Sequence, residues 1–309
     1  MRHVEVDGLR TSVIGLGTWQ FGSREWGYGA EYAAQTAPGL VRRALELGIT
    51  MLDTAEAYGL GRSERIIAGA LADIAPADRA DLIVATKFMP FAPAEPIVAR
   101  QAAGSRGRLG SDTLDLYYAH LRNPFVSVRR TMQALRPLVA AGLVHRVGVS
   151  NHDLAQWLEA ERAFRAPVVA NQVRFSLLSP APAGDLVPYA AAMGRVLVAH
   201  TPLGQGVLGR PPGGAAERPS GLRAASRHFR SGFQVRLAPL SEALHEIASA
   251  HGATPAQVAL AWVIHHPNTI AIPGARTIAQ LEENAAAADL VLEKAECARL
   301  SSLALEMAG

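Results

Sequence analysis

The chain has 309 residues, of which 49% are apolar, and its formal net charge is +3. This length suits one large domain or two ordinary ones, and the apolar content allows a sizeable core and argues against global disorder. No apolar run reaches the roughly 18 residues of a transmembrane helix. Five arginines lie in residues 218–236, but the other positive residues are scattered. Because nucleic-acid binding needs a concentrated basic face, neither a nucleic-acid nor a membrane partner is expected.

The first residues and the cysteine content bear on compartment and metal binding. Charges at Arg2, Glu5 and Asp7 interrupt the stretch that is apolar in a signal peptide, so a cytoplasmic protein is expected. Cys297 is the only cysteine, which excludes an internal disulfide and a cysteine metal cluster. The ten histidines show no HExxH spacing. The sequence therefore predicts no metal site.

Short β-rich runs alternate with longer amphipathic stretches along the chain. Residues 2–6 and 10–14 flank Asp7-Gly8, which are typical turn residues of a tight antiparallel hairpin. Eight further strands are predicted at residues 15–17, 51–53, 82–87, 114–120, 146–150, 168–173, 196–200 and 269–273.

Helical periodicity separates these strands. It predicts helices at residues 38–47, 63–73, 126–141, 153–164, 185–193, 237–250, 255–265, 277–288 and 294–305. Gly48 and Gly142 stand where glycines end helices, and Ser63 and Thr277 are typical N-terminal caps. Between the third and fourth of the eight strands, the glycines in residues 104–110 leave the helix poorly signalled.

Strands alternating with helices, without a linker or a break in composition, predict an α/β fold with a single domain over residues 1–309. The architecture expected is a (β/α)8 TIM barrel with an N-terminal β-hairpin and extra helices. A doubly wound sheet is the competing architecture. It favours GxGxxG after the first strand, and Gly15-Leu16-Gly17-Thr18-Trp19 does not continue in that way. The aperiodic stretch 203–235 is expected at the C-terminal face of the barrel, where ligands bind.

Four polar side chains follow the ends of consecutive predicted strands. Asp53 ends the second strand, Lys87 the third and His120 the fourth, and Tyr58 follows Asp53 in the same loop. A charged residue at the end of an apolar strand is costly unless it is paired, so a buried pair of Asp53 and Lys87 is expected. A structural salt bridge would explain either residue alone, but the four together favour catalysis.

This set suits proton transfer to a carbonyl oxygen that becomes an alkoxide. A phenol is a poor acid at neutral pH, but a nearby ammonium favours the phenolate, so Lys87 is expected to lower the pKa of Tyr58. Asp53 would hold Lys87 charged and in place. A neutral His120 would donate a hydrogen bond that orients the carbonyl.

The motifs around these residues resemble the aldo-keto reductase family over nearly the whole chain. Asp53-Thr54-Ala55-Glu56-Ala57-Tyr58-Gly59 is similar to the family's best-known motif, in which the Asp and the Tyr are catalytic. Ala85-Thr86-Lys87 resembles the segment with the catalytic lysine, and Leu114-Asp115-Leu116-Tyr117-Tyr118-Ala119-His120 resembles the segment with the histidine. The resemblance implies a barrel enzyme that moves a hydride between NADP(H) and the carbonyl carbon of a small aldehyde or ketone, with Tyr58 as general acid in reduction.

The resemblance also implies where NADP(H) is held. Gly15-Leu16-Gly17-Thr18-Trp19 is similar to the family's first-strand motif, and residues 148–151 and 171–172 to the segments that hold the nicotinamide carboxamide. Residues 202–206 resemble the loop against the pyrophosphate. The implied cofactor-binding residues are Gly17, Thr18, Trp19, Ser150, Asn151, Gln172, His200, Thr201, Pro202, Leu203, Gln205, Arg223, Gly274, Arg276, Gln280, Glu283 and Asn284.

Residues 272–284 resemble the adenosine-binding segment of the family. The N-terminus of the helix that opens at Thr277 favours an anion, and Arg276 is placed to take a ribose 2′-phosphate by paired hydrogen bonds. A preference for NADPH over NADH is therefore expected. Arg223 falls where related members place an arginine in a flap over the cofactor. A solvated helix face is the alternative explanation for the polar residues after Thr277.

The chain departs from the family pattern near the expected nicotinamide and substrate positions. The family usually has Tyr or Trp at His200, so His200 is expected either to stack on the nicotinamide or to turn to a backbone partner. A stacked His200 that protonates near neutral pH would repel NADP⁺ more than NADPH. The usual Trp-Pro-Asp after the histidine is replaced by Leu121-Arg122-Asn123-Pro124, which changes one wall of the substrate pocket. Trp19 and Trp26 are candidate pocket residues, with a core position as the alternative.

Two functional hypotheses follow. The first is an NADP(H)-dependent enzyme acting on a small-molecule carbonyl, as a monomer or a homo-oligomer. The second is an NADP(H)-binding redox-sensing or regulatory subunit with slow turnover, because the chain resembles bacterial members similar to the β subunits of voltage-gated potassium channels. Tight retention of cofactor with very slow turnover would favour the second.

Overall fold

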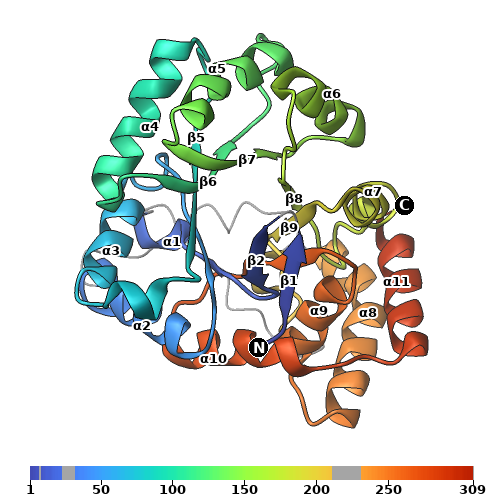
Figure 1. Cartoon of the computed structure of the whole chain (residues 1–309). Helices are drawn as coiled ribbons and strands as arrows, with labels where there is room; N and C mark the ends of the chain where they lie inside the picture. The colour runs from blue at the N-terminus through green and yellow to red at the C-terminus, as the bar shows by residue number, and fades with distance from the viewer. Residues whose placement is uncertain (7, 23–31, 211–230, 309) are drawn as a thin grey trace.

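The computed structural model describes residues 1–6, 8–22, 32–210 and 231–308. At its centre is an eight-stranded parallel sheet with the strand order β10-β9-β8-β7-β6-β5-β4-β3 (Figure 1). Its strands are β3 (Leu16–Gly17), β4 (Met51–Asp53), β5 (Ile83–Phe88), β6 (Leu114–Ala119), β7 (Val144–Ser150), β8 (Ala170–Arg174), β9 (Val196–His200) and β10 (Thr269–Ala271). Bridges from Ile14 to Ala271 and from Gly17 to Gly274 join the first strand to the last. The sheet closes in this way into the barrel expected from the sequence.

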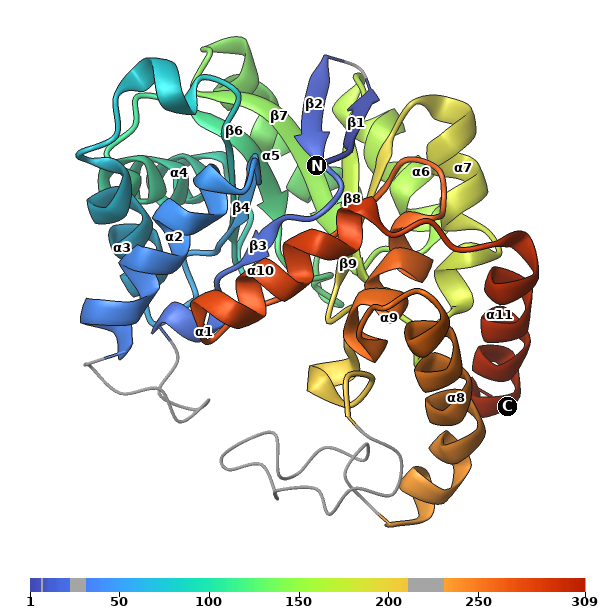
Figure 2. The same ribbon diagram turned by 90° about the horizontal axis from the view of Figure 1, so that it is seen from below.

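An antiparallel hairpin covers one end of the barrel. It consists of β1 (His3–Val6) and β2 (Leu9–Ser12), and Val6 and Leu9 pack with apolar side chains from inside the barrel such as Met51 and Leu116. The hairpin and α1 (Trp19–Gly22) lie at opposite ends in Figure 2. Because α1 follows the C-terminal end of β3, the hairpin seals the N-terminal ends of the strands, and the C-terminal ends are left for a site.

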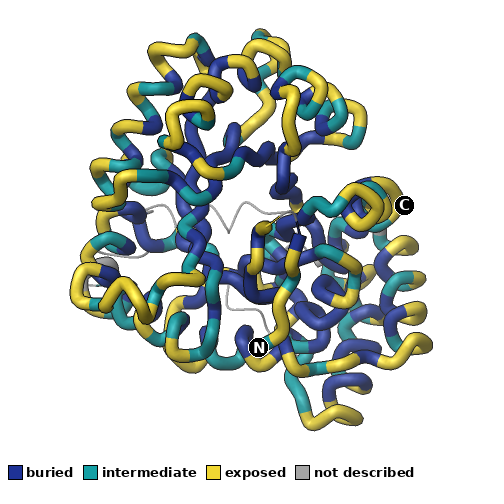
Figure 3. Tube along the Cα trace, in the orientation of Figure 1, coloured by how far each residue is buried: buried dark blue, intermediate teal, exposed yellow. Residues whose placement is uncertain are grey.

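Helices surround the strands, with buried inner faces and exposed outer faces (Figure 3). They are α2 (Ala37–Glu46), α3 (Arg62–Leu71), α4 (Glu95–Leu109), α5 (Val128–Ala140), α6 (Leu154–Phe164), α7 (Leu186–Met193), α8 (Ser231–Ala250), α9 (Pro255–Ile264), α10 (Ile278–Ala286) and α11 (Lys294–Ala308). Single turns lie at Tyr32–Thr36, Pro76–Arg79, Ala181–Ala183, Gly204–Gly206 and Ala287–Asp289. No helix in the described part of the chain is both long and apolar enough to cross a membrane.

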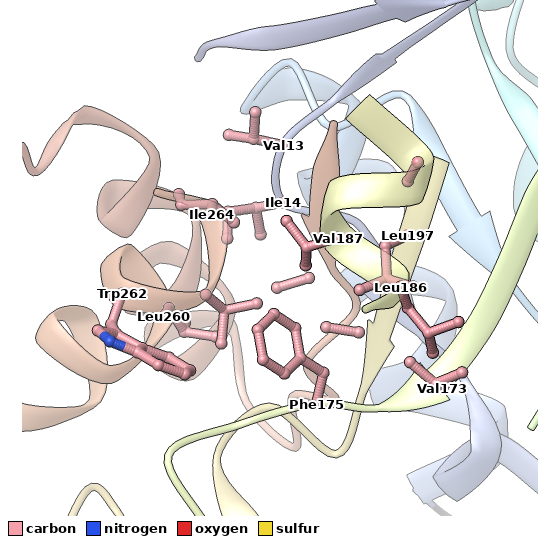
Figure 4. Close-up of a cluster of buried hydrophobic side chains, with 14 of the residues drawn as sticks. Val13, Ile14, Val173, Phe175, Leu186, Val187, Leu197, Leu260, Trp262 and Ile264 are labelled. Carbon is pink, nitrogen blue, oxygen red and sulfur yellow. The ribbon is translucent and has the colours of Figure 1, made fainter. Parts of the chain in front are cut away.

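The largest apolar cluster lies between the strands and the outer helices. Phe175 packs against Trp262 of α9 with ring centroids 5.4 Å apart, and Leu197 of β9 and Val187 of α7 lie beside them (Figure 4). Apolar area removed from water here holds the helices to the barrel, at about 25 cal/mol for each Å². The core thus fixes the strands whose ends carry the polar residues.

Helix ends agree with the sequence in part. Gly48 and Gly142 have φ of +75° and +70° after α2 and α5, as expected of glycines that end helices. Thr277 caps α10 by accepting a hydrogen bond from Gln280 N at 3.2 Å. Ser63 was expected to cap α3, but this is wrong, because the cap position is Gly61 and the Ser63 side chain is fully buried.

The glycine-rich stretch before β6 is helical, although the sequence signalled its helix poorly. α4 runs for 15 residues and buries Val98, Ala102 and Ser105, while Gly107 lies on its exposed side. Gly110 ends the helix with φ of +64°. Packing of one face therefore outweighs the low helix propensity of glycine, which costs up to about 1 kcal/mol per residue.

Candidate active site

The barrel brings the four polar residues of the strand ends together at its C-terminal end. Asp53 is the last residue of β4, Lys87 lies one residue before the end of β5, and His120 directly follows β6. Tyr58 lies in the loop between β4 and α3. Parallel neighbouring strands end at the same edge, so spacing along the sequence becomes contact in space.

Lys87 is the centre of this group. Its fully buried side chain donates from Nζ to Asp53 Oδ1 at 2.6 Å, to the Thr54 carbonyl at 2.7 Å and to Tyr58 Oη at 3.4 Å. An ammonium has three N–H donors, so all of them are used. Asp53 Oδ2 accepts a further hydrogen bond from Gln172 Nε2 at 2.7 Å. The ion pair expected from the strand ends is therefore present, and it holds the ammonium against the phenol.

The charges of this group follow from burial and pairing. Burial alone would lower the pKa of Lys87, but Asp53 and Tyr58 together outweigh it and raise that pKa, so Lys87 stays an ammonium. Burial raises the pKa of Tyr58, and Lys87 offsets only part of this rise. Lys87 thus acts in the expected direction, but the net pKa of Tyr58 is raised, since burying a phenolate costs more than one ammonium recovers. Tyr58 keeps its proton at neutral pH.

The imidazole of His120 is neutral. Burial lowers its pKa to about 3, and the charge of Lys87 adds to this. The ring meets Tyr58 edge-on, with centroids 5.7 Å apart and an angle of 78° between the planes. Its Nδ1 is buried and has no hydrogen-bond partner among the described residues. A neutral ring beside the phenol can donate one N–H to a bound carbonyl oxygen, in the charge state that the sequence argument required.

Trp19 lies beside the phenol of Tyr58. The two rings are stacked, with centroids 6.1 Å apart and an angle of 26° between the planes. The side chain of Trp19 is 43% exposed. This exposure favours a place in the pocket wall over the alternative of a core position.

A layer of buried hydroxyl groups supports the loop after β4. Thr18 Oγ1 donates to the Asp53 carbonyl at 2.8 Å and lies 2.8 Å from Ser63 Oγ. Thr54 Oγ1 donates to Ser63 Oγ at 2.9 Å. Because Thr18 is fully buried, its side chain braces the site from behind and does not line it. Ser63 has this bracing role in place of the helix cap that was expected.

A buried ion pair anchors β5 to two helices, and the sequence argument missed it. Glu64 is fully buried, accepts from Thr86 Oγ1 at 2.7 Å through Oε1 and pairs with Arg108 Nε at 2.5 Å through Oε2. A signal was available, because Glu64 shares the apolar face of α3 with Ile67 and Leu71 at helical spacing. A carboxylate on an apolar face requires a buried partner.

A chain of hydrogen bonds continues from Asp53 across the ends of β7, β8 and β9. Gln172 donates from Nε2 to Asp53, and Ser150 Oγ donates to the Gln172 carbonyl at 3.0 Å. Asn151 Nδ2 donates to Ser150 Oγ at 3.1 Å, and Asn151 Oδ1 lies 3.0 Å from His200 Nε2. The residues expected to hold the carboxamide are thus connected to each other, to His200 and to Asp53.

His200 is engaged through both ring nitrogens, since its Nδ1 lies 3.0 Å from Thr201 Oγ1. Burial lowers the pKa of His200 to about 3, and the charges of Arg174 and Lys87 lower it further. The hypothesis that His200 protonates near neutral pH is therefore wrong. Its partners are side chains of neighbouring loops, which also differs from the backbone partner considered as the alternative.

The loop after β9 turns tightly. Thr201, Gly204, Gln205 and Gly206 have φ of +56°, +57°, +63° and +87°. Pro202 is buried, and the half-buried Leu203 packs on the large core. This curled backbone lies at the C-terminal end of the barrel, where the resemblance expects the pyrophosphate.

The expected adenosine end lies at the amino end of α10. Arg276 is exposed, and its backbone N–H donates to Gln280 Oε1 at 2.9 Å. The side chain of Gln280 is therefore engaged with the backbone. Asn284 is buried and donates from Nδ2 to the Gly274 carbonyl at 3.5 Å, while Glu283 is half-buried. An exposed guanidinium next to a helix N-terminus suits an anion.

The seam between β3 and β10 requires glycine at position 17, whereas at position 274 only the flexible end of the Gln20 side chain would have to move. A Cβ on Gly17 would lie 2.7 Å from the Ile272 carbonyl oxygen, and one on Gly274 would lie 2.9 Å from Gln20 Oε1. Of the other candidates, Trp26 and Arg223 lie outside the described residues.

Comparison with known proteins gives the family. The model of the aldo/keto reductase family matches residues 13–305. This chain belongs to the aldo/keto reductase family. An uncharacterised oxidoreductase of Mycobacterium tuberculosis strain H37Rv is 46% identical over 293 residues, which are 94% of this chain and 89% of that protein. The family resemblance inferred from the motifs is confirmed.

Two further relatives have informative names. A methylglyoxal reductase of Escherichia coli strain K12 is 32% identical over 291 residues, which are 93% of this chain and 89% of that protein. A crystal structure of an aldo-keto reductase from Klebsiella pneumoniae in complex with NADPH has 31% identity and a TM-score of 0.78. The match covers 98% of this chain and 95% of that one.

In this aldo/keto reductase, exposed apolar side chains follow β3, β4, β5 and β6. They are Trp19, Leu60, Phe91, Leu121 and Phe125. Asn123 links two of the loops by donating from Nδ2 to the Pro90 carbonyl at 2.7 Å and the Phe91 carbonyl at 3.1 Å. Its Oδ1 accepts from Phe125 N at 2.9 Å. The segment that departs from the family pattern therefore ties the loops that carry Phe91 and Phe125.

Proposed function

We propose that this protein is an NADP(H)-dependent reductase of aldehydes or ketones, acting as a single barrel domain over residues 1–309, with Tyr58 as the general acid. The observation that carries the proposal is the fully buried Lys87, which bonds Asp53 Oδ1 at 2.6 Å and Tyr58 Oη at 3.4 Å. A protonated phenol against a fixed ammonium is suited to donate a proton, because the ammonium stabilises the phenolate that remains.

The residues present fit NADP(H). Gly17 leaves no room for a side chain against the Ile272 carbonyl, and the exposed Gly274 presents bare backbone beside it. Arg276 supplies an exposed cation next to the amino end of α10, suited to a 2′-phosphate. Asn151 and Gln172 supply amide groups suited to a carboxamide. The NADPH complex of the Klebsiella relative supports the same cofactor here.

The bound reduced cofactor supplies a hydride to the carbonyl carbon. The protein's part is to hold the carbonyl oxygen and to give it a proton. His120 in its neutral form donates an N–H to that oxygen, and Tyr58 transfers its phenolic proton as negative charge develops there. Lys87 keeps its own proton, since Asp53 and Tyr58 raise its pKa, and stabilises the phenolate. Asp53 holds the lysine in place.

Apolar loops favour small carbonyls with an apolar substituent. Phe91, Leu121 and Phe125 follow the strands that carry Lys87 and His120. The similarity to a methylglyoxal reductase adds a short dicarbonyl to the candidates. A screen of NADPH oxidation should therefore compare aromatic aldehydes, methylglyoxal and sugar carbonyls.

Tyr58→Phe tests the assignment of the acid. We expect kcat to fall roughly 100- to 10,000-fold, which is the typical contribution of general acid catalysis, while the Kd for NADPH stays nearly unchanged. Tyr118→Phe is the matched control, because Tyr118 also lies beside Lys87, 6.0 Å from Nζ to ring centroid, and no described residue bonds its hydroxyl. An unchanged kcat in Tyr58→Phe, or an equal loss in both variants, would contradict the role of Tyr58.

The same assay separates the enzyme from a regulatory cofactor-binding subunit. An enzyme turns over steadily with a suitable carbonyl and releases the oxidised cofactor. A protein that is purified with NADP(H) bound and shows very slow turnover across the screen would favour the regulatory hypothesis.

A further inference from the structure

The imidazole of His200 is locked in one hydrogen-bonding state. Its Nε2 lies 3.0 Å from Asn151 Oδ1, and an amide oxygen only accepts, so Nε2 carries the proton. A neutral imidazole has one N–H, so Nδ1 accepts from Thr201 Oγ1 at 3.0 Å. Both nitrogens are satisfied in this tautomer.

This arrangement fixes the direction of the Asn151 amide. Its oxygen is occupied by His200, and one of its two N–H groups is used at Ser150 Oγ, 3.1 Å away. No described residue accepts the second N–H. Asn151 is exposed, so this donor is available to a ligand.

The backbone on both sides of the contact is left-handed. Asn151 has φ of +57° and Thr201 has φ of +56°. Asparagine tolerates this left-handed region, but a β-branched residue such as threonine rarely adopts it. Such conformations persist where the surrounding structure enforces them, and they gather at functional sites. The strain at Thr201 puts its hydroxyl against the imidazole.

Gln172 is fixed in a complementary direction. Its Nε2 donates to Asp53 Oδ2 at 2.7 Å, which leaves Oε1 as the acceptor of this amide. One amide thus offers a donor and the other an acceptor, and a carboxamide has one acceptor oxygen and one donor nitrogen.

We propose that His200 is a positioning residue: its Nε2–H fixes the Asn151 amide so that Asn151 presents an N–H to the carboxamide oxygen of a bound nicotinamide. The proposal rests on the proposed function, since it requires NADP(H) at this site. In this proposal the His200 ring acts by hydrogen bonding to Asn151 and not by stacking on the nicotinamide.

Two substitutions of His200 distinguish hydrogen bonding from stacking. His200→Gln keeps an N–H donor near the position of Nε2 but has no ring, whereas His200→Phe keeps a ring but has no donor. We expect the Kd for NADPH, measured by quenching of tryptophan fluorescence, to be close to the parent value in His200→Gln. In His200→Phe it should be weaker by roughly two- to tenfold, the effect of losing one neutral hydrogen bond. The reverse order of the two variants would show that His200 stacks on the cofactor and would overturn the proposal.

A double-mutant cycle tests whether His200 acts through Asn151. Asn151→Gly removes the amide and suits the left-handed backbone. Once the amide is gone, adding His200→Phe should change the Kd for NADPH little further, because interacting residues give non-additive effects. Additive losses would mean that His200 affects the cofactor without Asn151, which contradicts the proposal.

A measurement on the free protein separates this proposal from the proposed function. Nitrogen NMR of the imidazoles, with His200→Gln identifying the signal, should show a neutral ring protonated at Nε2. Protonation at Nδ1, or an equal mixture of tautomers, overturns the positioning of Asn151 even if the protein reduces carbonyls. Normal NADPH binding without any turnover contradicts the reductase assignment alone. A parent protein that binds no NADPH overturns both the reductase assignment and the role of His200.

Discussion

Replacing Lys87 by methionine tests how the site carries a buried charge. The substitution removes the ammonium and keeps most of the side-chain volume. Among the described residues, Asp53 then retains Gln172 as its side-chain donor, and the Thr54 carbonyl loses the donor at 2.7 Å. An uncompensated carboxylate is left at a site where only 3% of Asp53 is exposed.

The size of the effect follows from this geometry. Removing one partner of a buried ion pair costs about 3–5 kcal/mol, because the remaining charge has lost both water and its counter-ion. We therefore expect Lys87→Met to lower the free energy of unfolding by about 4 kcal/mol at neutral pH. Replacing both partners of a buried ion pair by well-packed apolar residues is often close to neutral, and Asn at position 53 at least removes the uncompensated charge. The double variant Asp53→Asn/Lys87→Met should accordingly be more stable than Lys87→Met alone.

The pH dependence of the stability of Lys87→Met is a second, independent test. Burial raises the pKa of Asp53 above its ordinary value even with Lys87 and Gln172 opposing it, and without Lys87 the rise must be larger. Between the unfolded pKa of about 3.9 and this raised pKa, the Asp53 carboxyl is protonated in the folded state and ionised in the unfolded state. The stability of Lys87→Met should therefore increase as the pH falls through that window, by at most about 1.4 kcal/mol per pH unit. The double variant lacks the carboxyl and serves as the reference for all other titrating groups.

Equilibrium urea denaturation of the parent, both single variants and the double variant measures these differences, once refolding has been shown to be complete. The reasoning is refuted if the double variant loses as much stability as the two single variants added together. It is equally refuted if the difference between Lys87→Met and the double variant does not change with pH. Either result would mean that water or another cation compensates Asp53.

The remaining predictions concern cofactor binding. Arg276→Ala should raise the Kd for NADPH by about tenfold and leave the Kd for NADH nearly unchanged, since one charge-assisted contact to the 2′-phosphate is lost. Fluorescence titration with both cofactors measures this, and equal losses would show that Arg276 only supports α10. The ratio of Kd for NADP⁺ to Kd for NADPH should be flat between about pH 5 and 8, because burial lowers the pKa values of His200 and His120 to about 3 and both rings stay neutral. A ratio that rises below neutral pH and is flattened by His200→Gln would contradict this.

The residues at strand ends could be predicted because sequence distance translates simply into position in a barrel. Asp53, Lys87 and His120 each close an apolar run, and parallel strands deliver their ends to one edge. Their pairing then followed from the cost of an unpaired buried charge. The apolar runs also located the strands along the chain, because a strand covered on both faces is apolar along nearly its whole length.

Features that depend on contacts between distant segments could not be predicted in this way. Ser63 stands at the start of a helix and resembles a cap, but Thr18, 45 residues earlier in the chain, takes its hydroxyl. The pKa of Tyr58 depends mainly on how much water the folded loops exclude from the phenol. The neighbouring charges can be inferred from the sequence, but this burial cannot. His200 likewise depends on Asn151, 49 residues away, for the contact that fixes its ring.

The polar groups of the site that remain unpaired indicate what it can bind. Lys87 and Gln172 both donate to the Asp53 carboxylate, and Lys87 uses its other two N–H groups at Thr54 and Tyr58, so these residues mainly hold the geometry. His120 Nδ1 has no partner among the described residues, and one N–H of Asn151 is equally unused. A missing partner alone does not mark a ligand site, because the hydroxyl of Tyr118 inside the barrel also has none in the described part of the chain. His120 and Asn151 differ from Tyr118 in that each lies just beyond the end of its strand, at the C-terminal end of the barrel. An unsatisfied buried group costs about 1–3 kcal/mol, and a ligand that satisfies it recovers that cost on binding.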